Sequence, residues 1–150
     1  KILSNFGVSL AIEGFGDAVK ESDVIFLVVL DYKVATEWVS SLDHEALIGR
    51  TVIQFTTGCA TEARAFKALV GSHGGSDYLD GAIADYPAGV EEARALIHYS
   101  GSSALFEKLK PLLLSFGAPN FVGKASFPSP QHRFLSLSLS LSLSLSLSLS

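Results

Sequence analysis

The chain has 150 residues, of which 48% are hydrophobic, and a formal net charge of −4. This length suits a single domain with a buried core, and the apolar content excludes a disordered or fibrous class for most of the chain. Its Lys and Arg residues are scattered, which argues against nucleic acid as a partner, and its single cysteine, Cys59, excludes an internal disulfide and a multi-cysteine metal site.

The amino-terminal end carries neither a Met nor the apolar stretch of a signal peptide, and no apolar run is long enough to span a bilayer. We therefore expect a chain truncated at its start, with no membrane partner. The lone cysteine fits a reducing compartment, so a cytoplasmic location is expected.

The first motif is GFGDAV at residues 14–19, after a strand-like segment at residues 8–12. A turn that binds a dinucleotide has the pattern G-x-G-x-x-G between a strand and a helix. Here Val19 takes the place of the third glycine, and only six residues, 17–22, precede the next strand, whereas a parallel crossover needs about a dozen. A phosphate loop is one interpretation, but we prefer a turn followed by a short helix.

Residues 24–30 (VIFLVVL) form an uninterrupted apolar run, which is typical of a central strand buried on both faces of a parallel sheet. Asp31 is expected to cap the helix that follows. The residues that we expect on the core face of that helix are Val34, Trp38, Val39 and Leu42.

Residues 51–55 predict the next strand, Thr61 caps the next helix, and Gly74 and Gly75 end it. The expected core face of this helix consists of Ala63, Phe66, Leu69 and Val70.

Residues 78–83 and 96–99 predict two more strands, and residues 121–122 a short edge strand. Ser102 or Ser103 opens an intervening helix, which Gly117 closes and in which Pro111 predicts a kink or a break. Its expected core face is Leu105, Phe106, Leu109, Leu112, Leu113 and Phe116. Strands and helices alternating at these lengths predict an α/β fold with a doubly wound parallel sheet.

Residues 124–134 are expected to form a loop that leads into a strict Leu-Ser repeat at residues 135–150. A two-letter C/T repeat in DNA, read in triplets, encodes this peptide. An amphipathic strand is the alternative, but a 16-residue perfect repeat is unlike a bounded strand, and we interpret it as an artefact of the gene model.

Four segments together resemble a known family: VLDYKV (residues 29–34), FTTG (55–58), YLDGAIADYP (78–87) and IHYSGS (97–102). They are similar to the NADP-binding domain of imine reductases, relatives of the 6-phosphogluconate and 3-hydroxyisobutyrate dehydrogenases. The resemblance covers residues 1–123. It implies a Rossmann-type, mainly parallel sheet that lacks its first strand-helix-strand unit, which would explain the missing phosphate loop.

The resemblance implies NADP as the cofactor. It places Leu30, Asp31 and Val34 on the adenosine and ribose side and Thr57 near the nicotinamide ribose. Both loops would leave the carboxyl ends of neighbouring strands, where an open parallel sheet binds ligands. The alternatives stay open: Asp31 as a plain helix cap, and Thr57 as a turn hydroxyl bonded to its own backbone.

On the substrate side, the hydroxyacid dehydrogenases carry a Ser-Gly-Gly turn where this chain has Ala84, Asp85 and Tyr86. A carboxylate there would repel an acidic substrate, which favours a small-molecule imine or iminium. Asp85 as a solvated loop charge is the alternative.

The resemblance implies that the proton-handling residue and the helices that form a homodimer follow residue 123, so no catalytic residue is assigned. The four histidines, His44, His73, His98 and His132, show no metal-like pairing. Two hypotheses remain: a parent NADP-dependent oxidoreductase, and a chain that is a catalytically inactive remnant or at most a binding module.

Overall fold

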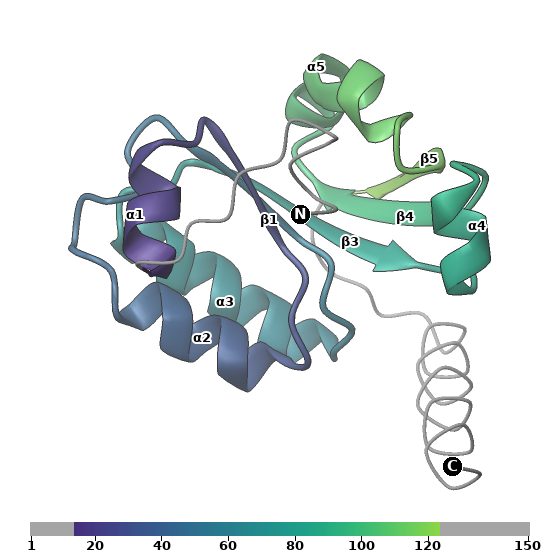
Figure 1. Cartoon of the computed structure of the whole chain (residues 1–150). Helices are drawn as coiled ribbons and strands as arrows, with labels where there is room; N and C mark the ends of the chain where they lie inside the picture. Colours follow the sequence, from purple (N-terminus) through teal and green to yellow (C-terminus); the bar gives the residue numbers. More distant parts are fainter. Residues whose placement is uncertain (1–13, 124–150) are drawn as a thin grey trace, which may run out of the picture.

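The computed structural model describes residues 14–123, in which helices and strands alternate (Figure 1). In chain order the elements are α1 (Phe15–Lys20), β1 (Val24–Leu27), α2 (Tyr32–Ser40), β2 (Thr51–Gln54), α3 (Ala60–Ser72), β3 (Asp77–Ile83), α4 (Pro87–Glu91), β4 (Leu96–Gly101), α5 (Ser103–Leu113) and β5 (Ala118–Gly123). The strand expected at residues 8–12, the loop at 124–134 and the Leu-Ser repeat lie outside the described residues.

The described strands form one sheet in the order β1-β2-β3-β4-β5. All neighbouring pairs are parallel except β3 and β4, which are antiparallel. The sheet is therefore mainly parallel, as the family resemblance implied, and one antiparallel pair interrupts the parallel order that the alternation of strands and helices alone predicts. The only helix in the connection between β3 and β4 is the five-residue α4. This helix spans about 7.5 Å, whereas β3 is roughly 23 Å long. The helix is therefore too short to return the chain to the other end of the sheet, and β4 starts at the edge where β3 ends.

Helices cover both faces of this sheet: α1, α2 and α3 lie on one side and α5 on the other (Figure 1). Two core clusters correspond to these two layers. One packs around Val52, Phe66 and Val70, and the other around Leu79 and Tyr99. Helices on both faces of a mainly parallel sheet confirm the predicted doubly wound α/β architecture.

β1 lies at one end of the described strand order, so the expectation that it is central is wrong for this part of the chain. Its alternate side chains still reach both layers, Ile25 and Leu27 on one side and Phe26 on the other. The strand is apolar throughout because helices cover both faces of the sheet at this strand. An apolar run of this kind does not tell whether the strand lies at the centre or at the edge of the sheet. The strand also ends at Leu27, earlier than predicted.

The GFGDAV motif forms a turn and a short helix, as preferred from the sequence. Gly14 precedes α1 with φ +143, a conformation that favours glycine, and Gly16 lies inside the six-residue helix. Val19, at the position of the expected third glycine, is buried in the core beneath the helix.

Two expectations for α2 and α3 are wrong. Trp38 is 43% exposed, and its ring lies 5.3 Å from that of Phe15 on α1 instead of in the core. The buried face of α2 is Tyr32, Ala35 and Val39, which follow the i, i+3, i+7 spacing that sets a helix face. In α3, the residue that caps the helix is Cys59 rather than Thr61.

α5 begins at the Ser102 cap and runs through Pro111 without a break, so the predicted break is wrong. Pro111 lies in the last turn, and the helix ends two residues after it, at Leu113. Leu105, Phe106 and Leu113 face the core as expected, but Leu112 is 39% exposed. After Gly117, β5 forms the expected edge strand of the described sheet.

Candidate functional site

Three loops meet at one edge of the sheet because β1, β2 and β3 are parallel neighbours. They are residues 28–31, 55–59 and 84–86, and each follows the carboxyl end of its strand. In open α/β sheets, ligands bind at this edge. The topology therefore brings together the residues that the resemblance implicates in cofactor and substrate binding.

The loop after β1 combines exposed apolar side chains with a fixed backbone. Val28 and Leu30 are 70% and 88% exposed. Asp31 caps α2, and its Oδ1 accepts a hydrogen bond from the Val34 amide at 2.8 Å. The cap interpretation of Asp31 is thus confirmed, and a cofactor contact would be an additional role for the same carboxylate.

The loop after β2 is joined to the first loop by Thr56. The buried Thr56 hydroxyl donates to the Val29 carbonyl at 3.1 Å, and the Val29 amide is 3.4 Å from the same oxygen. The neighbouring Thr57 is exposed, and its hydroxyl has no hydrogen bond with any residue from 14 to 123. The backbone-bonded alternative for Thr57 is therefore not seen, and the hydroxyl can bond to a ligand.

Gly58 brings this turn close to α2. A Cβ atom at position 58 would lie 2.4 Å from Cδ2 of Tyr32, so only glycine fits there without a shift. One residue later, the Cys59 amide donates to the Glu62 carboxylate at 2.7 Å, which fixes the start of α3.

Beneath these two loops lies a buried polar pair. The Tyr32 hydroxyl donates to Oδ1 of Asp80 at 2.7 Å, and both side chains are less than a tenth exposed. Burial raises the pKa of Asp80 to about 6, although hydrogen bonding from Tyr32 opposes that rise. The Tyr78 hydroxyl also lowers the pKa of Asp80, although this hydroxyl makes no hydrogen bond of standard geometry to a described residue.

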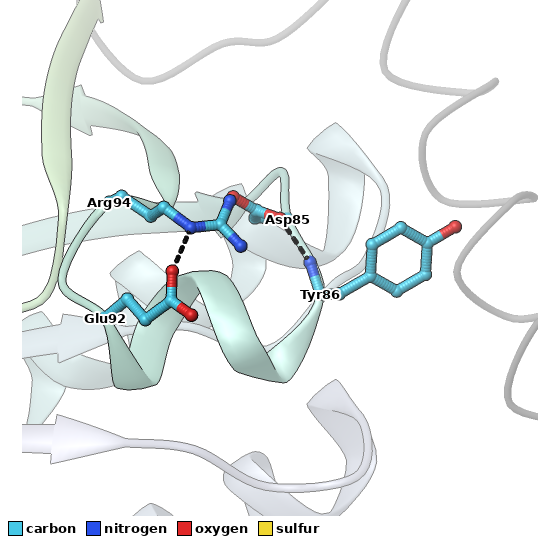
Figure 2. A network of polar contacts seen from close by, with 4 residues as sticks. All are labelled: Asp85, Tyr86, Glu92 and Arg94. Atoms are coloured by element: carbon cyan, nitrogen blue, oxygen red, sulfur yellow. Dashed lines mark hydrogen bonds and ion pairs between the residues drawn. The ribbon is translucent and has the colours of Figure 1, made fainter.

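The loop after β3 contains a small network of charges (Figure 2). Oδ1 of Asp85 accepts from the Tyr86 amide at 2.7 Å, and Nη1 of Arg94 lies 3.7 Å from Oδ2 of the same carboxylate. Arg94 also pairs with Glu92, whereas the ring of Tyr86 points away from the network and is 71% exposed. Asp85 is thus a half-buried, paired charge rather than the solvated loop charge of the alternative.

A groove lined mainly by apolar side chains runs beside β1. Its lining includes Phe15 and Ala18 of α1, Trp38 of α2 and the chain from Val24 to Val29. The groove reaches the carboxyl edge at Val28 and Val29, so it opens next to the first of the three loops.

Within residues 14–123, no three His, Cys, Asp or Glu side chains cluster closely enough to hold a metal ion. His44 stacks on His73 with ring centroids 5.6 Å apart, and Nδ1 of His98 lies 2.9 Å from the Asn120 amide nitrogen. His132 lies outside this range. In the same part of the chain, each helix falls short of the length and apolar character that crossing a bilayer requires.

Residues 7–125 match the family described as the NAD binding domain of 6-phosphogluconate dehydrogenase. The chain therefore belongs to this family of NAD(P)-binding domains, which are parts of oxidoreductases. The family resemblance drawn from the sequence is confirmed.

Two characterised relatives represent the two branches of that resemblance. The 2-hydroxy-3-oxopropionate reductase of Escherichia coli K12 is 28% identical over 112 residues, which cover 73% of this chain and 38% of the relative. The NADPH-dependent reductive aminase of Aspergillus oryzae is 27% identical over 108 residues, covering 71% and 36%. The aligned part thus spans well under half of either relative.

Among solved structures, the imine reductase of Myxococcus stipitatus in complex with NADP+ is similar, with a TM-score of 0.81 and 35% identity. The alignment covers 97% of this chain and 51% of that one, so the chain spans about half of the enzyme. A variant of the same enzyme was solved with NAD+, at a TM-score of 0.80.

The family resemblance implicates Leu30, Asp31, Thr57, Ala84 and Asp85, and the structure places all five at one edge of the sheet. The resemblance does not single out the residues that hold the loops in place, which are Tyr32, Thr56, Asp80 and Arg94. Tyr32 and Asp80 do lie in the VLDYKV and YLDGAIADYP segments. The only signal in the sequence was the charged Asp80 within a predicted strand.

Proposed function

We propose that this chain supplies the adenosine, nicotinamide-ribose and substrate-facing loops of an NADP site in an oxidoreductase. The parent enzyme would move a hydride from the nicotinamide to a carbon-nitrogen or carbon-oxygen double bond. The cofactor supplies that chemistry when it is bound, and the protein supplies placement. We also propose that the parent is a cytoplasmic homodimer.

One observation carries this proposal. The three most exposed large hydrophobic residues in the described part of the chain are Leu30, Tyr86 and Val28, and all three lie at the carboxyl edge. Large apolar side chains that are left in water beside a rigid backbone mark a binding surface.

The order of the loops across the sheet supports a cofactor lying along this edge. The loop with Leu30, Asp31 and Val34 would contact the adenosine and its ribose. Thr57, one strand further on, would offer its hydroxyl to the nicotinamide ribose. Ala84 and Asp85, after the third strand, would then face the substrate.

The charge of the β3–α4 loop favours an imine or iminium substrate. Asp85 and Glu92 carry two negative charges against the one positive charge of Arg94, so the network of Figure 2 has a net charge of −1. This charge attracts a cationic iminium and opposes a carboxylate. Arg94 weakens the effect that a lone Asp85 would have.

The competing function is a chain that binds no cofactor on its own. The observation in its favour is the length of α1, which has only six residues. The helix that follows a dinucleotide-binding glycine turn is longer, so the GFGDAV turn does not form such a unit within residues 14–123.

A titration of the 15N-labelled 150-residue chain with NADPH, followed by amide NMR shifts, tests the proposal. We expect shifts at residues 28–34, 55–59 and 84–86, with half-saturation near or above about 1 mM, because the pyrophosphate has no glycine-rich turn to bind among the described residues. AMP should shift only the first of these segments, and pyrophosphate none of them.

The absence of shifts up to about 10 mM NADPH would favour the competing function. Binding tighter than millimolar would contradict the expectation that this chain alone holds the cofactor weakly. Parallel titration with NADH tests the choice of cofactor, because tighter binding of NADH would contradict NADP.

A further inference from the structure

A buried tyrosine-carboxylate pair connects the centre of the sheet to the two cofactor loops. Tyr32 is the first residue of α2 and follows Asp31 directly, whereas Asp80 lies inside β3. Their 2.7 Å hydrogen bond joins positions that are 48 residues apart in the chain. This bond ties the start of α2 to the third strand.

The same tyrosine also supports the second loop. Its ring lies under Gly58 so closely that a Cβ there would come within 2.4 Å of it. The ring also packs edge-on against Phe66 of α3, with centroids 5.6 Å apart. Tyr32 thus lies between the loop that follows β1 and the turn that follows β2.

Hydrophobic packing alone does not require these polar groups. A phenylalanine facing a leucine would fill similar space without burying a carboxyl group, whose desolvation is costly. The chain shows the contrast itself, because the buried Tyr99 hydroxyl on the opposite face makes no hydrogen bond to any described residue. A directional bond therefore distinguishes Tyr32 from an ordinary core tyrosine.

We propose that Tyr32 and Asp80 are positioning residues, whose buried hydrogen bond holds the loop between β1 and α2 in register with the turn between β2 and α3. This inference rests on the proposed function, because the register is useful only if both loops contact one cofactor. Neither residue touches the cofactor in this proposal.

The first test needs no cofactor. Amide hydrogen exchange is compared in the wild-type chain, Tyr32→Phe and the matched control Tyr99→Phe. Four amides in or next to these loops report on register, since each donates to a side chain in a loop or in an element that flanks it: Val29, Val34, Thr56 and Cys59. In Tyr32→Phe they should exchange roughly tenfold faster, the effect of losing one bond to a charged acceptor.

Exchange at the Ala118 amide, which bonds to the Ala95 carbonyl near β5, should stay unchanged in both variants. Equal acceleration of this amide and the four loop amides would mean a general loss of stability, and it would overturn the proposal. So would equal effects of Tyr32→Phe and Tyr99→Phe.

Rescue by a conservative change separates positioning from packing. Asp80→Asn keeps an oxygen that can accept from Tyr32 and should retain wild-type exchange at the loop amides. Asp80→Leu keeps the branched outline of the side chain with a larger volume and lacks the acceptor, and it should behave like Tyr32→Phe. Identical behaviour of the Asn and Leu variants would contradict a role for the hydrogen bond.

The second test adds NADPH to the same variants. Tyr32→Phe should weaken binding several-fold, and Tyr99→Phe should leave it unchanged. If wild-type binds no NADPH but its loop amides respond as described, the proposed function fails and the positioning stands. If NADPH binds equally well to wild-type and Tyr32→Phe, the positioning fails and the site stands.

Discussion

At the scale of single residues, Asp80 is the carboxyl group in residues 14–123 whose pKa the fold shifts most clearly. It lies in β3 between Tyr32 and Tyr78 and is 8% exposed. Burial favours its neutral form, whereas the Tyr32 hydroxyl favours the charged form. Because burial prevails, the folded chain holds a proton on this group more tightly than the unfolded chain does.

This difference predicts how stability changes with pH. The pKa of Asp80 rises from 3.8 to about 6 on folding, so the folded state binds more protons between these values, and the free energy of unfolding falls as pH rises through that window. The fall should be on the order of 2 to 3 kcal/mol. Above about pH 6 the contribution is constant.

Asp80→Asn removes the titrating group and should flatten this part of the profile. Urea unfolding between pH 3.5 and pH 7, followed by the fluorescence of Trp38, the single tryptophan, measures both chains. Parallel profiles for wild-type and Asp80→Asn would show that Asp80 does not have the raised pKa.

At the scale of elements, the turn between β2 and α3 depends on its contact with α2. Gly58 lies against the Tyr32 ring, and Thr56 bonds to the backbone after β1. The geometry of the edge therefore comes from the contacts between elements as much as from the elements themselves.

Two glycines give a matched comparison of this contact. Gly58→Ala places a methyl group 2.4 Å from the Tyr32 ring and should lower the free energy of unfolding by about 1 to 3 kcal/mol. Gly71→Ala lies inside α3 with nothing within 4 Å of the new atom, and it should raise stability by roughly 0.5 to 1 kcal/mol. Urea unfolding measures both, and a Gly58→Ala chain as stable as wild-type would contradict the close packing of turn on helix.

At the scale of the whole molecule, the alternation of strands and helices was readable from the sequence because apolar runs and caps are local signals. Asp31 and Ser102 cap their helices as predicted. The reversal between β3 and β4 was not readable, because strand direction depends on how the connection packs and not on the strand itself.

The candidate site divides in the same way. Leu30, Asp31 and Thr57 came from the family resemblance, and the apolar pattern placed the segments that contain them near strand ends. The Tyr32–Asp80 bond spans 48 residues, and the Asp85–Arg94 pair forms only because α4 turns back beside its own N-terminal loop. Contacts of this kind are products of the fold, so composition and spacing could not predict them.

In the proposed function, a cofactor lies along the carboxyl edge with its adenosine over the first loop and its nicotinamide ribose over the second. Intermolecular NOEs between NADPH and the 13C-methyl-labelled chain locate both ends of the cofactor. We expect NOEs from the methyl groups of Val28, Leu30 and Val34 to the adenine protons, and from Thr57 to the nicotinamide ribose. The reversed order, or NOEs confined to methyl groups of β4, α5 and β5, would contradict it.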